Sequence, residues 1–248
     1  TDVRGDVEFD DVWFRYPGTE RWVLEGISFR IPAGQTVAIV GATASGKSTL
    51  VRLIPRLYDA TRGTVRLDGV DVRSLALDQL RRSVAMVPQE PFLFSESLRR
   101  NLELAGGTEV DEAVEIAALT ETLEDLTDGL ETLLGERGVN LSGGQKQRAT
   151  IARALVRDAP VLILDDSLSA VDTVTEERIL HGLRRYMRGR TSIVVAHRVS
   201  AVAEADLILV LEDGRLVETG THLELLSRGG TYARLLERQL LAEQIEAG

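Results

Sequence analysis

The sequence of 248 residues contains no cysteine, which excludes disulfide bonds, thiolate metal sites and a cysteine nucleophile. Lysine is almost absent: Lys47 and Lys146 are the only two among 29 basic residues. No apolar run reaches the length that spans a bilayer, and no signal peptide is recognisable. Because the chain begins at Thr1 and not at methionine, we expect it to be a piece of a longer protein.

Basic residues are also fewer than acidic ones, 29 against 39. The formal net charge of −10 at pH 7 argues against a nucleic-acid-binding surface, because neutralising phosphates requires clustered basic residues. Hydrophobic residues make up 44% of the chain, which is enough for a buried core and too many for a disordered protein. The length suits one large α/β domain or two small ones.

One of the two lysines lies in a strand–loop–helix pattern at residues 36–50 (TVAIVGATASGKSTL). In this context Gly41 and Gly46 let backbone N–H groups turn toward phosphate oxygens, and the helix start adds its positive dipole. Lys47 can reach the β- and γ-phosphates, and the Ser48 hydroxyl can bind Mg²⁺. A glycine-rich turn without a ligand is the alternative, but the context predicts binding of a nucleoside triphosphate. The predicted binding residues are Gly41, Ala42, Thr43, Ala44, Ser45, Gly46, Lys47, Ser48 and Thr49.

Two adjacent carboxylates follow the apolar run at residues 161–164. In open α/β sheets, ligands bind at the carboxyl ends of the parallel strands. We therefore expect Asp165 to hold Mg²⁺ through water and Asp166 to approach an attacking water molecule. Two solvated loop aspartates would give the same pattern.

Three further side chains lie where they can contact the nucleotide, its Mg²⁺ or an attacking water. Gln89 follows the strand predicted at 83–87, and its amide can reach Mg²⁺ or an attacking water. His197 stands at the tip of the strand predicted at 192–196, where it can contact a γ-phosphate. Tyr16 precedes a Pro-Gly turn and can stack on a nucleobase. The respective alternatives are a polar loop residue, a structural histidine and an edge-strand tyrosine.

A second candidate for phosphate contact starts a predicted helix. Ser142 and Gln145 fit a capping box. Capping does not explain Gly143 and Gly144 in the first turn, where glycine lowers helix stability. Glycines at that place leave N–H groups open to an anion that approaches end-on.

The order of the predicted elements gives the fold class. Residues 95–156 are mostly helical by periodicity, whereas 1–94 and 157–248 mix strands and helices. We expect an α/β protein with one domain over 1–248: a phosphate-loop NTPase core with a mainly parallel sheet, an antiparallel β subdomain and an inserted helical subdomain at 95–156.

Taken together, these motifs resemble the nucleotide-binding domain of an ABC transporter of the exporter type, from residue 7 to about 241. The most specific match is LSGGQ at 141–145, because other phosphate-loop enzymes lack it. The resemblance implies that 41–48 is the Walker A loop, 161–165 the Walker B strand and 169–172 the D-loop. It also assigns Tyr16 to the adenine platform, Gln89 to the Q-loop and His197 to the switch. Residues 134–138 resemble a loop that contacts the membrane domain.

The resemblance further implies ATP and Mg²⁺ as ligands, a transmembrane domain as partner, and a place at the cytoplasmic face of the membrane. A second nucleotide-binding domain would bind head to tail, so that Ser142, Gly143, Gly144 and Gln145 contact the ATP held by the other subunit. Closure of this pair on ATP, followed by hydrolysis, would power export.

Two positions depart from the family. Ala44 replaces a usual glycine, which is a mild change unless the backbone there needs a positive φ. Asp166 replaces a glutamate that positions the attacking water, so its carboxylate is one methylene too short. This substitution favours a slow site and the degenerate subunit of a heterodimeric exporter. The alternatives are an ATP-gated dimerisation module without useful turnover, or a soluble ABC-type ATPase.

Overall fold

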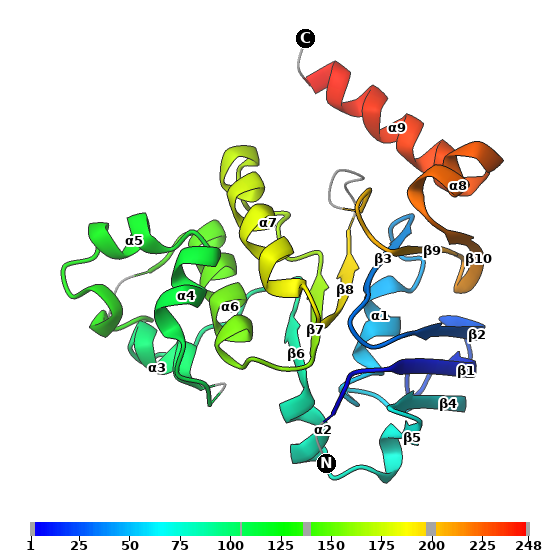
Figure 1. The fold of residues 1–248 in the computed structure, drawn as a ribbon, viewed down its shortest axis with the longest axis horizontal. Helices are drawn as coiled ribbons and strands as arrows, with labels where there is room; N and C mark the ends of the chain where they lie inside the picture. Colours follow the sequence, from blue (N-terminus) through cyan, green and yellow to red (C-terminus); the bar gives the residue numbers. More distant parts are fainter. Residues whose placement is uncertain (1–2, 105, 136–139, 197–201, 247–248) are drawn as a thin grey trace.

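The computed structural model describes residues 3–104, 106–135, 140–196 and 202–246, with only the backbone of 243–246. Within these residues, six strands form one sheet in the order β10-β9-β3-β8-β7-β6 (Figure 1). All neighbours are parallel except β10, which pairs antiparallel with β9. The mainly parallel sheet expected from the sequence is therefore confirmed. Its strands are β3 (Thr36–Gly41), β6 (Val84–Val87), β7 (Val161–Asp165), β8 (Thr191–Val195), β9 (Leu207–Glu212) and β10 (Arg215–Gly220).

A second sheet is antiparallel, in the order β2-β1-β4-β5, and matches the predicted antiparallel subdomain. The strand that begins at Val7 ends at Phe14, where pairing with the neighbouring strand stops at Leu24. A turn then forms, closed by a hydrogen bond from the Thr19 N–H to the Tyr16 carbonyl. Tyr16 is consequently a turn residue and not an edge-strand tyrosine. The strands are β1 (Val7–Phe14), β2 (Leu24–Ile31), β4 (Arg62–Leu67) and β5 (Val70–Asp71).

The parallel sheet separates two hydrophobic cores, because its side chains alternate between its faces. Val37 and Ile39 point into a core shared with helix α1 (Lys47–Arg52) and the antiparallel sheet. Ala38 and Val40 belong to the opposite core, which the helical segment covers. The chain therefore leaves β3 between two packed layers, and this fixes the position of the loop that follows.

The helical segment expected at 95–156 contains only helices and loops apart from one isolated bridge, as far as the structure describes it. Figure 1 shows α3 to α5 at one end of the molecule and the antiparallel sheet at the other. Within the helical segment, the helix that begins at Val110 ends at Ile116, and Ala118 then adopts a positive φ of 53°. The elements are α3 (Leu98–Glu103), α4 (Val110–Ile116), α5 (Thr120–Asp125), η2 (Gly129–Glu131) and α6 (Gly143–Val156).

The remaining helices flank the sheet, and α9 extends away from the body toward the C-terminus (Figure 1). Within the described residues, no helix combines the length and the apolar content needed to cross a bilayer. These elements are η1 (Val72–Ser74), α2 (Leu77–Ser83), α7 (Thr173–Met187), α8 (His222–Arg228) and α9 (Thr231–Glu246).

Candidate nucleotide site

The phosphate loop (Gly41–Thr49) joins β3 to α1, as the sequence predicted. Its first and last glycines are required by packing. A Cβ at Gly41 would lie 2.2 Å from the Leu211 carbonyl oxygen. At Gly46, which has a φ of 101°, a Cβ would lie 2.9 Å from the Leu24 side chain. The loop therefore keeps its close backbone path only with glycine at both places.

Ala44 occupies the left-handed region, with φ 64°. A positive φ is the condition under which replacing the family's usual glycine by alanine matters, and this position has one. For a residue with a Cβ, this conformation is about 1–2 kcal/mol less favourable than the right-handed one. The side chain is exposed.

Lys47 is buried, with 5% of its surface exposed, and its ammonium points into the loop. It donates to the carbonyl oxygens of Gly41 and Ala42, both at 2.8 Å, and to Ser45 Oγ at 3.4 Å. Burial lowers the pKa of Lys47, whereas the carboxylates of Asp166 and Asp165 act in the opposite direction. The cation is held at the centre of the loop by acceptors that a phosphate oxygen can replace.

The Ser48 hydroxyl and the Asp165 carboxylate meet at the carboxyl edge of the parallel sheet. Ser48 Oγ donates to Asp165 Oδ1 at 2.7 Å, and Asp165 is completely buried. Arg52, which the sequence did not single out, places Nη2 3.9 Å from Asp165 Oδ2. Hydroxyl and carboxylate oxygens are the donors that Mg²⁺ prefers, so this pair fits the predicted metal site.

Gln89 and Asp166 come together from the ends of neighbouring strands β6 and β7. Gln89 Nε2 donates to Asp166 Oδ2 at 3.3 Å. Asp166 has a φ of 46°, and its N–H donates to the Val195 carbonyl at 2.9 Å, so the chain turns sharply after β7. His197, the third predicted catalytic residue, lies outside the described residues.

The signature motif (residues 141–145) starts α6 and lies in the helical segment. Ser142 Oγ accepts from the Gln145 N–H at 3.2 Å, and Gln145 Oε1 accepts from the Ser142 N–H at 2.8 Å, which confirms the capping box. Ser142 and Gly143 are exposed. One turn further on, Gln147 Oε1 accepts from the Ala170 N–H at 3.0 Å, which ties α6 to the predicted D-loop.

Tyr16 lies beside the phosphate-loop helix. Its hydroxyl is 2.9 Å from Thr49 Oγ1, and its ring packs edge-on against Phe14 and Tyr58. A cavity of about 680 Å³ adjoins these rings and is also lined by Glu20 and Asp59. This volume falls in the range of small-molecule sites.

A buried lysine within a glycine-pinned loop, together with a serine–aspartate pair at the adjacent strand end, defines a phosphate-loop NTPase domain. The chain belongs to the ABC transporter family, whose model matches residues 24–169. Its type is the ATP-binding domain of an exporter.

Known proteins agree with this assignment. The ATP-dependent lipid A-core flippase of Aromatoleum aromaticum is 48% identical over 246 residues, covering 97% of this chain and 41% of the relative. The flippase of Pseudomonas aeruginosa is 48% identical over 238 residues, covering 94% and 40%. A solved structure described as a bacterial Atm1-family ABC exporter with ATP bound has a TM-score of 0.91 and 44% identity, over 96% of this chain and 42% of that one. The chain thus spans about two fifths of the flippases it matches.

Proposed function

We propose that this chain binds Mg-ATP through its phosphate loop and uses ATP-driven pairing with a second nucleotide-binding domain to power export. The observation that carries the proposal is the buried Lys47 ammonium, held inside the loop beside the Ser48–Asp165 pair. Lys47 and the loop N–H groups would hold the β- and γ-phosphates. Ser48, Asp165 and Gln89 would hold Mg²⁺, which shields phosphate charge when bound.

The signature motif would complete the site of the partner domain. Its support is the geometry of the α6 start, where Ser142 and Gln145 each accept from the backbone N–H of the other and Gly143 is exposed. The N–H groups of a helix start attract anions. Since a γ-phosphate would be enclosed only by two chains, its presence would favour the closed pair and its loss the open one.

Asp166 would position the attacking water, with a shorter reach than the family's usual glutamate. Small misplacements of a general base lose much of the roughly 10²–10⁴-fold that such a group supplies. We therefore propose slow turnover at this chain's own site, and a different subunit with a glutamate as the favoured partner. His197 would contact the γ-phosphate, as the sequence suggested.

A transmembrane domain would dock near Gln89, placing this chain at the cytoplasmic face of a membrane. The support is a group of exposed apolar side chains beside that residue, with Phe92 60% and Phe94 49% exposed and packed edge-on at 4.9 Å. The Arg153 guanidinium fixes this segment by donating to the Phe92 carbonyl at 2.8 Å. The loop at 134–138, proposed for the same partner, extends beyond the described residues.

The second candidate function is an ATP-gated dimerisation module without useful turnover, and Asp166 is the observation that favours it. ATP turnover separates the two, measured for the chain alone and mixed with a glutamate-bearing partner domain. Export predicts turnover in the mixture, and the dimerisation module predicts none.

The Asp166→Glu variant tests the role of this residue directly. We expect ATP turnover about 10- to 100-fold faster than that of the natural chain, because the longer side chain restores the reach of the base. Asp166→Asn, of matched length, should be slower still. Rapid turnover by the natural chain, with no gain in the glutamate variant, would refute the degenerate site.

A further inference from the structure

Three aromatic rings form a cluster between the antiparallel sheet and the phosphate-loop helix. Tyr16 and Tyr58 pack edge-on, with ring centroids 5.3 Å apart and planes at 88°. Phe14, buried beneath them, lies 5.0 Å from Tyr16 and 5.6 Å from Tyr58. Edge-to-face packing fixes the plane of a ring as well as its position. The face of Tyr16 is therefore oriented by its aromatic neighbours.

A hydrogen bond fixes the far end of the same ring. The Tyr16 hydroxyl is 2.9 Å from Oγ1 of Thr49, which is only 7% exposed and stands one residue after Ser48. Because Thr49 is in the first turn of α1, this bond ties Tyr16 to the element that carries Lys47.

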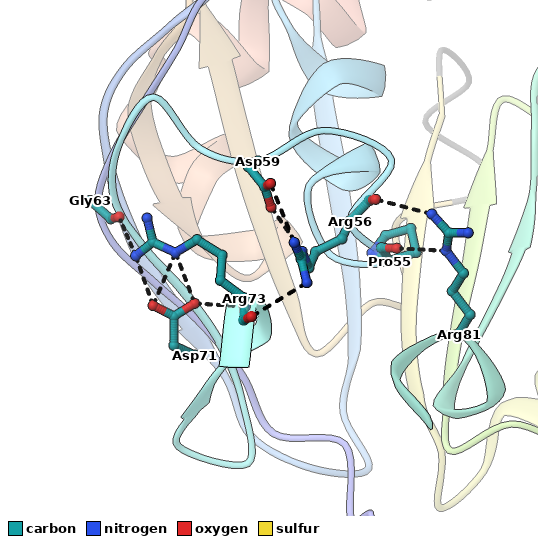
Figure 2. Close-up of polar contacts among 7 residues, drawn as sticks. All are labelled: Pro55, Arg56, Asp59, Gly63, Asp71, Arg73 and Arg81. Atoms are coloured by element: carbon teal, nitrogen blue, oxygen red, sulfur yellow. Dashed lines mark hydrogen bonds and ion pairs between the residues drawn. The ribbon is translucent and has the colours of Figure 1, made fainter. Parts of the chain in front are cut away.

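Arginine side chains contact the residues that flank Tyr58 in the chain, and Figure 2 shows these contacts at Pro55, Arg56 and Asp59. Arg56 donates through Nε to Asp59 Oδ1 at 2.8 Å and through Nη1 to the Arg73 carbonyl at 3.4 Å. Arg81 of α2 donates to the carbonyls of Pro55 and Arg56, at 3.5 and 3.3 Å. Residues on both sides of Tyr58 thus take part in hydrogen bonds, and those of Arg56 link this turn to neighbouring segments.

We propose that Thr49 and Tyr58 are positioning residues that hold the Tyr16 ring in place for a nucleobase. Through Tyr16 they would raise the affinity for the base-bearing part of the nucleotide, in addition to any contact that Thr49 makes with the phosphates as a phosphate-loop residue. This inference rests on the proposed function, in which Tyr16 stacks on the base of ATP. It adds that Tyr16 is held in place by three parts of the chain: the end of β1, helix α1 and the turn that carries Tyr58.

The test compares the affinities of the chain for Mg-ATP and for magnesium tripolyphosphate, which has no base, by calorimetry. Thr49→Val removes the hydroxyl, and Tyr58→Leu removes the edge-on ring. Each should weaken ATP binding about 2- to 10-fold, as expected for one neutral hydrogen bond or one aromatic pair. Tyr58→Leu should leave tripolyphosphate binding unchanged, whereas Thr49→Val, inside the phosphate loop, should weaken ATP binding more than tripolyphosphate binding. Thr49→Ser and Tyr58→Phe keep the contacting groups and should restore ATP affinity.

The bond to Tyr16 has its own check in a double variant. Tyr16→Phe and Thr49→Val delete the two ends of one hydrogen bond, so combining them should weaken ATP binding no more than either alone. Additive losses would overturn the bond as the cause. Equal losses for ATP and tripolyphosphate in Thr49→Val would place its action on the phosphates and also overturn the proposal.

Two controls separate this inference from its foundation. Phe29→Leu removes a stacked aromatic pair with Phe9 in the same sheet, at 4.6 Å, and should change neither affinity. Tyr16→Leu should weaken ATP but not tripolyphosphate binding; if it does not, the platform itself is wrongly assigned. If Tyr16→Leu has that effect and the Thr49 and Tyr58 variants do not, only the bracing proposal fails.

Discussion

Of the two regions proposed to contact phosphate, the phosphate loop and the start of α6, the first contains Gly41 and Gly46 for a different reason than the second contains Gly143. In the loop, Gly41 and Gly46 have no room for a Cβ, because strand and loop neighbours of the same chain crowd them. At the start of α6, a Cβ on Gly143 would meet no heavy atom within 4 Å among the described residues. The first pair is explained within one chain. Gly143 lacks such an explanation in the described part of the chain, and a partner chain would supply it.

The largest effect should come from Lys47→Ala in the loop. Removing charge-assisted contacts to phosphate should weaken Mg-ATP binding at least about 100-fold, measured by calorimetry. The matched control is Lys146→Ala, which removes the other lysine, on α6, and should leave ATP binding to the single chain intact. Retained affinity in the Lys47 variant would undo the assignment of the loop.

Alanine substitutions at Gly41 and Gly143 test the contrast itself. Gly41→Ala forces a Cβ against the Leu211 carbonyl and should lower the free energy of unfolding by about 1–3 kcal/mol. Gly143→Ala should raise it by up to about 1 kcal/mol, since alanine favours helix. Chemical denaturation measures both. Destabilisation by Gly143→Ala would mean that the glycine is required within the chain.

A smaller effect is expected from the helix caps. Ser142→Ala should lower the free energy of unfolding by about 1 kcal/mol, because the Gln145 N–H loses its acceptor. Thr221→Ala breaks the equivalent capping box of α8 and should cost a similar amount. We expect ATP-dependent pairing of chains, measured by sedimentation, to be weakened only in the Ser142 variant. Equal loss of pairing in both variants would mean that Ser142 acts only as a helix cap.

The smallest expected change is a gain from Ala44→Gly. Glycine relieves the strain of φ 64°, and part of this gain is offset by the greater freedom of glycine in the unfolded chain. The net increase in the free energy of unfolding should be about 0.5–1 kcal/mol by chemical denaturation. Ala42→Gly, two residues earlier in the loop and not at positive φ, should give no gain.

The sequence predicted what depends on local pattern and on strand order. The phosphate loop, the capping box at Ser142 and the two sheets follow from residue spacing and turn chemistry. The sequence also indicated that Gln89 and Asp166 lie near each other, because the carboxyl ends of parallel strands share one edge of the sheet.

What escaped prediction depends on packing between distant segments. Arg52 reaches Asp165 only because α1 lies against the end of β7, and Tyr58 meets Tyr16 only because a turn folds back over β1. The positive φ of Ala44 likewise follows from the loop geometry and not from its sequence, which places alanine there.

The most direct test of the composite site uses the absence of cysteine, since introduced thiols are then the only ones. Chains carrying Ala44→Cys and chains carrying Ser142→Cys, both at exposed positions, are mixed and oxidised with and without a nonhydrolysable ATP analogue. We predict a covalent pair that forms only in the mixture and only with nucleotide. No pair under any condition would contradict pairing between two copies of this chain, and an intrachain disulfide in the monomeric double variant would contradict a site shared between two chains.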